Sequence, residues 1–165
     1  RAVPKRYRLA NAKRARMRRS VIDKLENENI TLASVGKRAV AWGIDKFLIS
    51  VLFYAVYYEK FDGLDYEQIS ALAMEMIPQI VLLEVIYQTF FTWYCGASIG
   101  KVAMKIVCVD IDLLDKPGLL NSLTRSLVRI ISENAFFLGF AWAFSNPLFQ
   151  TWQDKAAKTV VINVY

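Results

Sequence analysis

Residues 39–58 read AVAWGIDKFLISVLFYAVYY and contain two charged side chains, Asp45 and Lys46. A helix needs about 20 mostly apolar residues to cross the hydrocarbon core of a bilayer, and this stretch supplies that length. Three tyrosines fall at its C-terminal end, where amphipathic rings favour the boundary between lipid and water. The stretch therefore predicts a transmembrane helix.

Two more apolar blocks follow this predicted helix in the sequence. Residues 69–95 read ISALAMEMIPQIVLLEVIYQTFFTWYC and are long enough to span the bilayer with a tilt. Residues 134–149 read NAFFLGFAWAFSNPLF, carry no charge and are short for a full crossing. Gly139 and Asn146-Pro147 are positions at which this last block can break, which favours a short re-entrant or steeply folded helix. The three blocks together predict a polytopic membrane protein.

Charge is distributed unevenly along the 165 residues. The whole chain has 21 basic and 15 acidic residues, a net charge of +6. Residues 1–30 hold ten of the basic and three of the acidic residues, a local charge of +7, so the rest of the chain sums to −1. The loop 59–68, EKFDGLDYEQ, has four acids and one lysine. Because positively charged loops stay in the cytoplasm, we expect a cytoplasmic N-terminus and a periplasmic 59–68 loop.

The composition argues against an ordinary enzyme. There is no histidine, so a Ser-His or Cys-His relay and a histidine-ligated metal are excluded. Cys95 and Cys108 are the two cysteines, which is too few for a zinc cluster or a disulfide scaffold. The sequence contains no Walker loop and no GxGxxG motif for nucleotide binding. We therefore expect no enzyme activity, no cofactor and no metal site.

The C-terminal third contains two short strand-like segments and one amphipathic segment. Residues 104–112 and 158–165 are rich in β-branched side chains and predict strands that can pair if both lie on one side of the bilayer. Between them, LLNSLTRSLVRIIS (119–132) places leucines and isoleucines on one helical face and Arg125 and Arg129 on the other. This pattern favours an interfacial helix or a wall of the bundle.

These elements define the predicted fold class, an all-α membrane protein. We expect a small transmembrane bundle of three or four membrane helices, one of them interfacial or re-entrant, with a short cytoplasmic β-ribbon. Residues 1–32 are expected to form a basic cytoplasmic arm, and residues 33–165 the transmembrane domain.

Ionisable side chains inside membrane helices are costly and therefore informative. Arg38 lies at the start of the first predicted helix, and Asp45 follows seven residues later. Seven residues are nearly two turns, so both side chains share one face and lie about 10 Å apart along the axis. We expect Asp45 to pair with Arg38, with Lys46 or with another helix, or else to form an ion or proton site. Glu84 lies near the middle of the second block and is a possible intramembrane polar site.

Near the C-terminus, Trp152-Gln153-Asp154 precedes KAAKTVVI, and there the sequence resembles the RDD family of bacterial membrane proteins. That family is named for an arginine at the start of the first helix, an aspartate within it and a second aspartate near the end of the domain. The matching residues are Arg38, Asp45 and Asp154, together with Gly100-Lys101 after the second helix and Thr159-Val160-Val161 at the close.

The resemblance covers roughly residues 33–162 and implies a multi-pass protein of the bacterial inner membrane. A few family members look like cation/proton antiporters, which implies a functional role for the intramembrane aspartate. The sequence departs from the family at Lys105, where many members have glycine. Asp154 itself is expected to be a polar residue near the membrane surface that anchors the terminal segment.

Several arginines are candidates for contact with lipid headgroups or a partner protein. A basic segment beside a membrane is attracted to anionic lipid by about 1 kcal/mol per Lys or Arg. An acidic protein surface is an equally open partner, whereas nucleic acid is not expected, because Tyr7 is the one aromatic residue among the first 30. The candidate contact residues are Arg14, Arg16, Arg18, Arg19, Arg125 and Arg129.

Two functions remain open from the sequence. The small size, the abundant aromatic residues and the long basic arm favour an accessory or structural subunit that binds other membrane subunits or copies of itself. The alternative is a cation/proton transporter that uses Asp45, although no inverted repeat is detectable within the chain.

Overall fold

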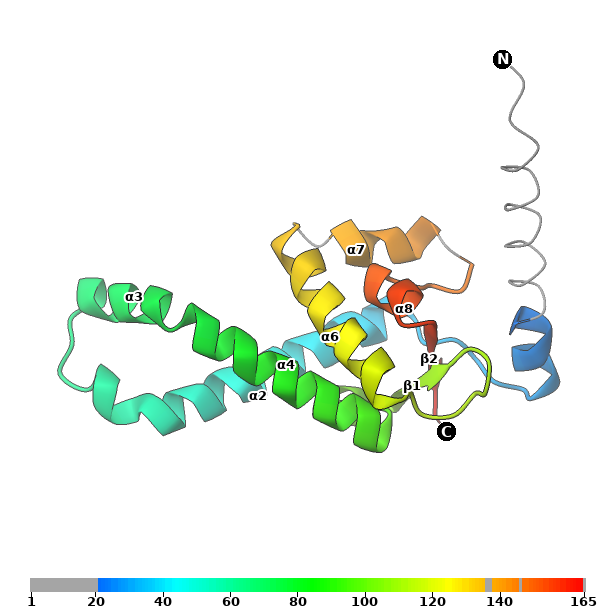
Figure 1. The fold of residues 1–165 in the computed structure, drawn as a ribbon, viewed down its shortest axis with the longest axis horizontal. Coiled ribbons are helices and arrows are strands. Elements are labelled where there is room, and N and C mark those ends of the chain that lie inside the picture. The colour runs from blue at the N-terminus through cyan, green and yellow to red at the C-terminus, as the bar shows by residue number, and fades with distance from the viewer. Residues whose placement is uncertain (1–20, 136–137, 146, 165) are drawn as a thin grey trace, which may run out of the picture.

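The computed structural model describes residues 21–135, 138–145 and 147–164. Two long helices, α2 (Val35–Phe61) and α4 (Ile77–Cys95), cross each other and form the body of the molecule (Figure 1). The far end of α2 and the helix α3 (Tyr66–Glu75) extend away from this crossing. The C-terminal elements gather at the opposite end, around the start of α2.

Helix α2 confirms the predicted transmembrane helix. It begins where the side chain of Ser34 accepts a hydrogen bond from the backbone N–H of Lys37, an N-terminal cap that satisfies one of the first unpaired amides. Among the described residues, α2 is the one unbroken helix that is long and apolar enough to cross a membrane. Up to three spans result if each of two bent helix pairs is counted as one span.

The first bent pair consists of α3 and α4, which meet at an angle of 53°. The break falls at Met76, and Pro78 lies in the first turn of α4, where a missing backbone N–H costs nothing. The second apolar block is therefore divided into helices of 10 and 19 residues, in place of one tilted helix.

The second bent pair turns more sharply. Helix α6 (Leu119–Asn134) is followed by α7 (Leu138–Ala141) and the 3₁₀ turn η1 (Trp142–Ser145), which lie at 108° to it. This agrees with a steeply folded segment, although Gly139 is not the break point. Gly139 is buried within α7, and a Cβ atom there would lie 2.1 Å from Ser132 Oγ. Glycine is needed because α7 packs closely on α6.

The predicted β-ribbon is confirmed. Strand β1 (Ile106–Asp110) pairs antiparallel with β2 (Thr159–Asn163), and Cys108 lies opposite Val161. The five-residue helices α5 (Ile99–Ala103) and α8 (Trp152–Ala156) lead into these two strands.

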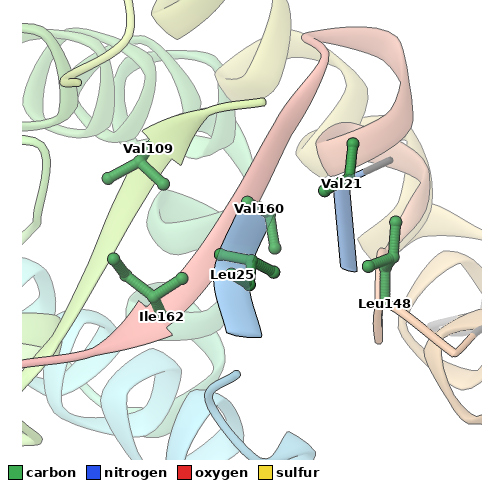
Figure 2. Packing of buried hydrophobic residues seen from close by; sticks show 6 residues of the cluster. All are labelled: Val21, Leu25, Val109, Leu148, Val160 and Ile162. Carbon is green, nitrogen blue, oxygen red and sulfur yellow. The ribbon is translucent and has the colours of Figure 1, made fainter. Parts of the chain in front are cut away.

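The ribbon is covered on both faces because strand side chains alternate. Ile106, Cys108 and Val161 pack with Ala33 and Ala41 around the start of α2. The other face packs against the helical residues 21–27. Figure 2 shows this second cluster, which consists of Val21, Leu25, Val109, Leu148, Val160 and Ile162. Residues 21–32, expected as the end of a free arm, therefore pack onto the ribbon.

Helix α6 has its polar face turned inward. Leu120, Leu127 and Ile131 are 78%, 48% and 61% exposed, whereas Arg125 and Arg129 on the opposite face are buried. Lipid is as apolar as leucine, so a membrane helix loses nothing by presenting leucines outward and serines and arginines to its neighbours. This is the arrangement expected of a bundle wall.

Candidate functional site

Polar side chains from five helices surround one small cavity inside the molecule. Its volume is about 50 Å³, room for a few water molecules. Three groups of hydrogen-bonded charges surround or adjoin this cavity, centred on Asp154, Asp45 and Glu84. The lining residues are Arg38, Trp42, Asp45, Gln88, Thr92, Lys101, Arg125, Ser126, Arg129, Phe140, Thr151, Gln153, Asp154 and Val161.

Asp154 is fully buried at the start of α8. Its Oδ2 accepts hydrogen bonds from the backbone N and the Oγ1 of Thr151, at 3.0 and 2.9 Å, in a capping box. Arg38 approaches the same oxygen at 3.1 Å, and Arg125 binds Oδ1. Burial alone raises the pKa of Asp154, but Arg125, Arg38 and the Thr151 bonds outweigh it and hold the pKa below its usual value. Asp154 is therefore the buried centre of an ionic cluster, where a surface anchor was expected.

Arg38 connects the start of α2 to three other segments. Besides Asp154, its guanidinium donates to the carbonyl oxygens of Phe149 at 2.6 Å and Val161 at 3.1 Å. The expected pairing of Arg38 with Asp45 is wrong, because the Arg38 side chain reaches toward α8 and β2. Asp45 lies about 10 Å further along the helix, beside α4 and α5.

Asp45 is buried and accepts four hydrogen bonds. Tyr87 Oη and the backbone N of Gly100 each donate to Oδ1 at 2.8 Å. Gln88 Nε2 and Ser98 Oγ donate to Oδ2 at 3.1 and 2.6 Å. A carboxylate has about four lone-pair sites, so these four donors saturate it. The interaction fixes α2 against α4 and against the start of α5.

Gly100 has a specific packing role in this contact. A Cβ atom at this position would lie 2.1 Å from the carbonyl oxygen of Ala41 and 2.8 Å from Asp45 Oδ1. No side chain fits there, so glycine allows the α5 backbone to reach the Asp45 carboxylate.

Glu84 is buried between the helices and belongs to the third group. Lys46 Nζ bridges Glu84 Oε2 at 2.6 Å and Glu133 Oε2 at 2.7 Å. Arg129 Nε donates to Glu133 Oε1 at 3.0 Å, an ion pair between side chains one turn apart on α6. Trp42 Nε1 also donates to Glu133, at 2.7 Å.

Arg125 and Arg129 lie in a different environment from the one expected. Both were expected at lipid headgroups or a partner, yet they are 7% and 8% exposed and pair with carboxylates of this chain. The reason is the inward polar face of α6. The four other candidate contact residues, Arg14, Arg16, Arg18 and Arg19, lie outside the described residues.

The geometry thus joins an arginine at the start of the first helix to a distant terminal aspartate and buries a second aspartate within the helix. The sequence model of the RDD family matches residues 32–158. The chain belongs to the RDD family. No curated protein and no solved structure matches it. The three residues that give the RDD family its name therefore lie in two separate buried sites in this chain, one at Asp154 and one at Asp45.

Sequence reasoning missed three of the groups that hold the Asp45 carboxylate, Tyr87, Gln88 and Ser98. One signal for them was available. Glu84, Gln88 and Thr92 recur every four residues within an apolar block and are all buried on α4. In a membrane helix, such a polar row marks the face that packs against protein.

Lys101, the second residue of the RDD Gly-Lys motif, lines the cavity from α5. Burial, with a smaller contribution from the nearby Arg125, lowers the pKa of Lys101 to about 8. Within the described part of the chain, its ammonium group donates no hydrogen bond. This lysine therefore adds a basic side chain to the lining of the cavity.

Proposed function

We propose that this RDD-family chain is an accessory subunit of a larger assembly in the bacterial inner membrane. The observation that carries the proposal is the outer face of α2. Exposed apolar or small residues recur on it at spacings of three and four along the helix. They are Gly36, Val40, Gly43, Phe47, Val51, Tyr54 and Tyr58, which we call the α2 stripe.

Two glycines make this stripe suitable for a close helix contact. Apart from the neighbouring residues and the adjacent backbone of α2 itself, a Cβ atom at Gly36 or Gly43 would have no described atom within 4 Å. Small residues on membrane helices let two backbones approach closely, and van der Waals packing then drives association. We assign the α2 stripe to a transmembrane helix of another subunit or of a second copy of this chain.

The buried charges support the same proposal in a different way. Asp45 is saturated by four donors, and Asp154 is held by two arginines and a threonine. These hydrogen bonds and ion pairs hold α2, α4, α6 and α8 in one fixed arrangement, as a structural subunit requires. The proposal includes no enzymatic activity.

Gly43→Leu tests the proposal on the outer surface. The substitution should leave the fold intact, because the position is open, but should reduce the amount of partner that co-purifies from membranes in a mild detergent by about tenfold or more. Ala55→Leu, which is exposed on α2 off the stripe, is the matched control. Mass spectrometry of the purified complexes measures the stoichiometry. Recovery of wild-type chain alone, with no stoichiometric partner or second copy, would refute the subunit role.

A second candidate is cation/proton transport that uses Asp45, supported by the ionisable residues around the cavity. The saturated carboxylate weighs against it, because a cation would have to displace existing donors. Purified protein in vesicles should therefore show no cation/proton exchange. Exchange that is lost in Asp45→Asn and retained in Gly43→Leu would establish transport and reject the subunit proposal.

The basic residues 1–19 supply a further contact in the proposal. Nine of the 21 basic residues lie there, with no acidic residue among them. We assign this segment to anionic lipid headgroups on the cytoplasmic side or to an acidic partner surface.

A further inference from the structure

The cavity between α2, α5, α6 and α8 has an unequal set of charges. Four basic side chains line it, those of Arg38, Lys101, Arg125 and Arg129. Two carboxylates, Asp45 and Asp154, are the acidic lining residues within the described part of the chain. Arg129 also pairs with Glu133 and lies near Glu84, and Lys46 bridges these two carboxylates beside the cavity. With all these groups ionised, the cavity and this adjoining group together carry one more positive than negative charge.

Several of the donors around the cavity have unused hydrogen-bonding capacity. Arg38 Nε and Arg129 Nη2 are buried and make no hydrogen bond. Arg129 Nη2 lies 3.7 Å from Glu84 Oε1, beyond hydrogen-bond length, and both arginine side chains are 9% exposed. Lys101, as described above, also donates to no group in the described chain. The two arginine nitrogens are buried, whereas Lys101 is partly exposed. Buried donors without a partner in the protein are rare, and a water molecule or an ion beside them can accept their hydrogen bonds.

The acceptors around the cavity are used almost completely. Asp45 accepts four hydrogen bonds, and Asp154 accepts from Arg38, Arg125 and twice from Thr151. An entering cation would meet four positive groups and two saturated carboxylates. Two acceptors there are unpaired, Gln153 Oε1 in the lining and Glu84 Oε1 beside Arg129. The Gln153 amide also carries an NH₂ group that can donate to an anion.

We infer that this cavity binds one small monovalent anion, of the size of chloride, through Lys101, Arg38 and Arg129. The volume of about 50 Å³ has room for one small anion with a water molecule. The anion accepts hydrogen bonds from the donors that have no partner in the chain. Its negative charge balances the excess positive charge. The inference does not depend on the proposed subunit role, because the site lies inside the chain.

Binding of radioactive chloride to the full chain in detergent tests the site directly. Ionic strength is kept constant with potassium gluconate, because gluconate is a much larger anion than chloride. We expect saturable binding at one chloride per chain, and a rise in the thermal unfolding temperature as chloride replaces gluconate. Replacing potassium by sodium at constant chloride should change neither result.

Three variants distinguish chloride binding at this cavity from a general effect of the charge of the protein. Lys101→Gln should weaken chloride binding at least tenfold, whereas Lys105→Gln, an exposed lysine outside this cavity, should bind like the wild type. Gln153→Glu is nearly isosteric and adds a negative charge to the lining, so it should also weaken binding at least tenfold. It keeps the test decisive if Lys101→Gln fails to fold. Absence of saturable chloride binding in the wild type, or equal loss in Lys105→Gln and Gln153→Glu, would overturn the inference.

Discussion

At the scale of single residues, the packing of the buried charges depends on which carboxylate each arginine pairs with. Arg38 and Asp154 are separated by 116 residues in the chain and lie 3.1 Å apart in the fold. Arg38 and Asp45 share a helix but belong to different groups. Removing one partner from a buried ion pair leaves an uncompensated charge, which typically costs about 3–5 kcal/mol.

A double-mutant cycle distinguishes the two carboxylates. We predict that Arg38→Gln and Asp154→Asn each destabilise the chain, and that their effects are non-additive by about 0.5–3 kcal/mol because they share one interaction. Arg38→Gln combined with Asp45→Asn should be additive to within about 0.5 kcal/mol. Denaturant unfolding in mixed micelles measures both cycles. Non-additivity confined to the Asp45 cycle would contradict the observed pairing.

The lowered pKa of Asp154 predicts a pH dependence of stability. The folded-state pKa lies below the unfolded value of about 3.8, so the unfolded chain takes up the proton first as the pH falls. The stabilisation is therefore fully present above about pH 5 and is lost as the pH drops through the folded-state pKa. Asp154→Asn should show a flatter loss of the free energy of unfolding between pH 5 and 2. Identical pH profiles for the two proteins would mean that Asp154 does not contribute.

At the scale of helices and strands, the sequence predicts what depends on local pattern. The apolar length of α2, the β-branched strands and the two faces of α6 are properties of neighbouring residues, and the structure contains all three. The pairing of Arg38 and the four donors to Asp45 depend on segments 42 to 123 residues away. No spacing within one helix encodes these contacts. The bundle-wall alternative for α6 agrees with the structure, but the expected lipid or partner contact of Arg125 and Arg129 is wrong, because the polar face of this helix is turned toward the other helices.

The packing of residues 21–27 on the ribbon gives a prediction at this scale. Leu25 is 3% exposed and lies against Val160 and Ile162 (Figure 2). We predict that Leu25→Ala destabilises the ribbon by about 2–5 kcal/mol, because it removes buried methyl groups and leaves a cavity. The neighbouring exposed Glu26→Ala should change stability by less than about 0.5 kcal/mol. Thermal unfolding in detergent measures both, and equal stability of the two variants would show that this segment does not pack in solution.

At the scale of the whole molecule, the chain combines a charged interior with an apolar exterior. Phe47, Leu82 and Phe90 are 68%, 60% and 49% exposed, whereas Asp45, Glu84 and Arg129 are 1%, 5% and 8% exposed. Such a distribution would be unstable in water and suits a bilayer, where ionisable groups must find partners inside the protein. The RDD match and the membrane-length helix α2 agree with this environment.

The orientation of this molecule in the bilayer is the last prediction. The basic N-terminal region precedes α2, and the acidic residues 59–68, expected as a loop, form the end of α2, a short turn and the start of α3. Positively charged segments stay in the cytoplasm. In a Cys95→Ser background, which removes the exposed native thiol and leaves the buried Cys108, two exposed positions serve as reporters. Asp62→Cys should react with a membrane-impermeant maleimide in intact spheroplasts. Lys24→Cys should react only after the membrane is opened, because it lies with the ribbon on the cytoplasmic side. The reverse labelling pattern would place the ribbon and the buried ionic cluster at the outer surface and would reject the predicted topology.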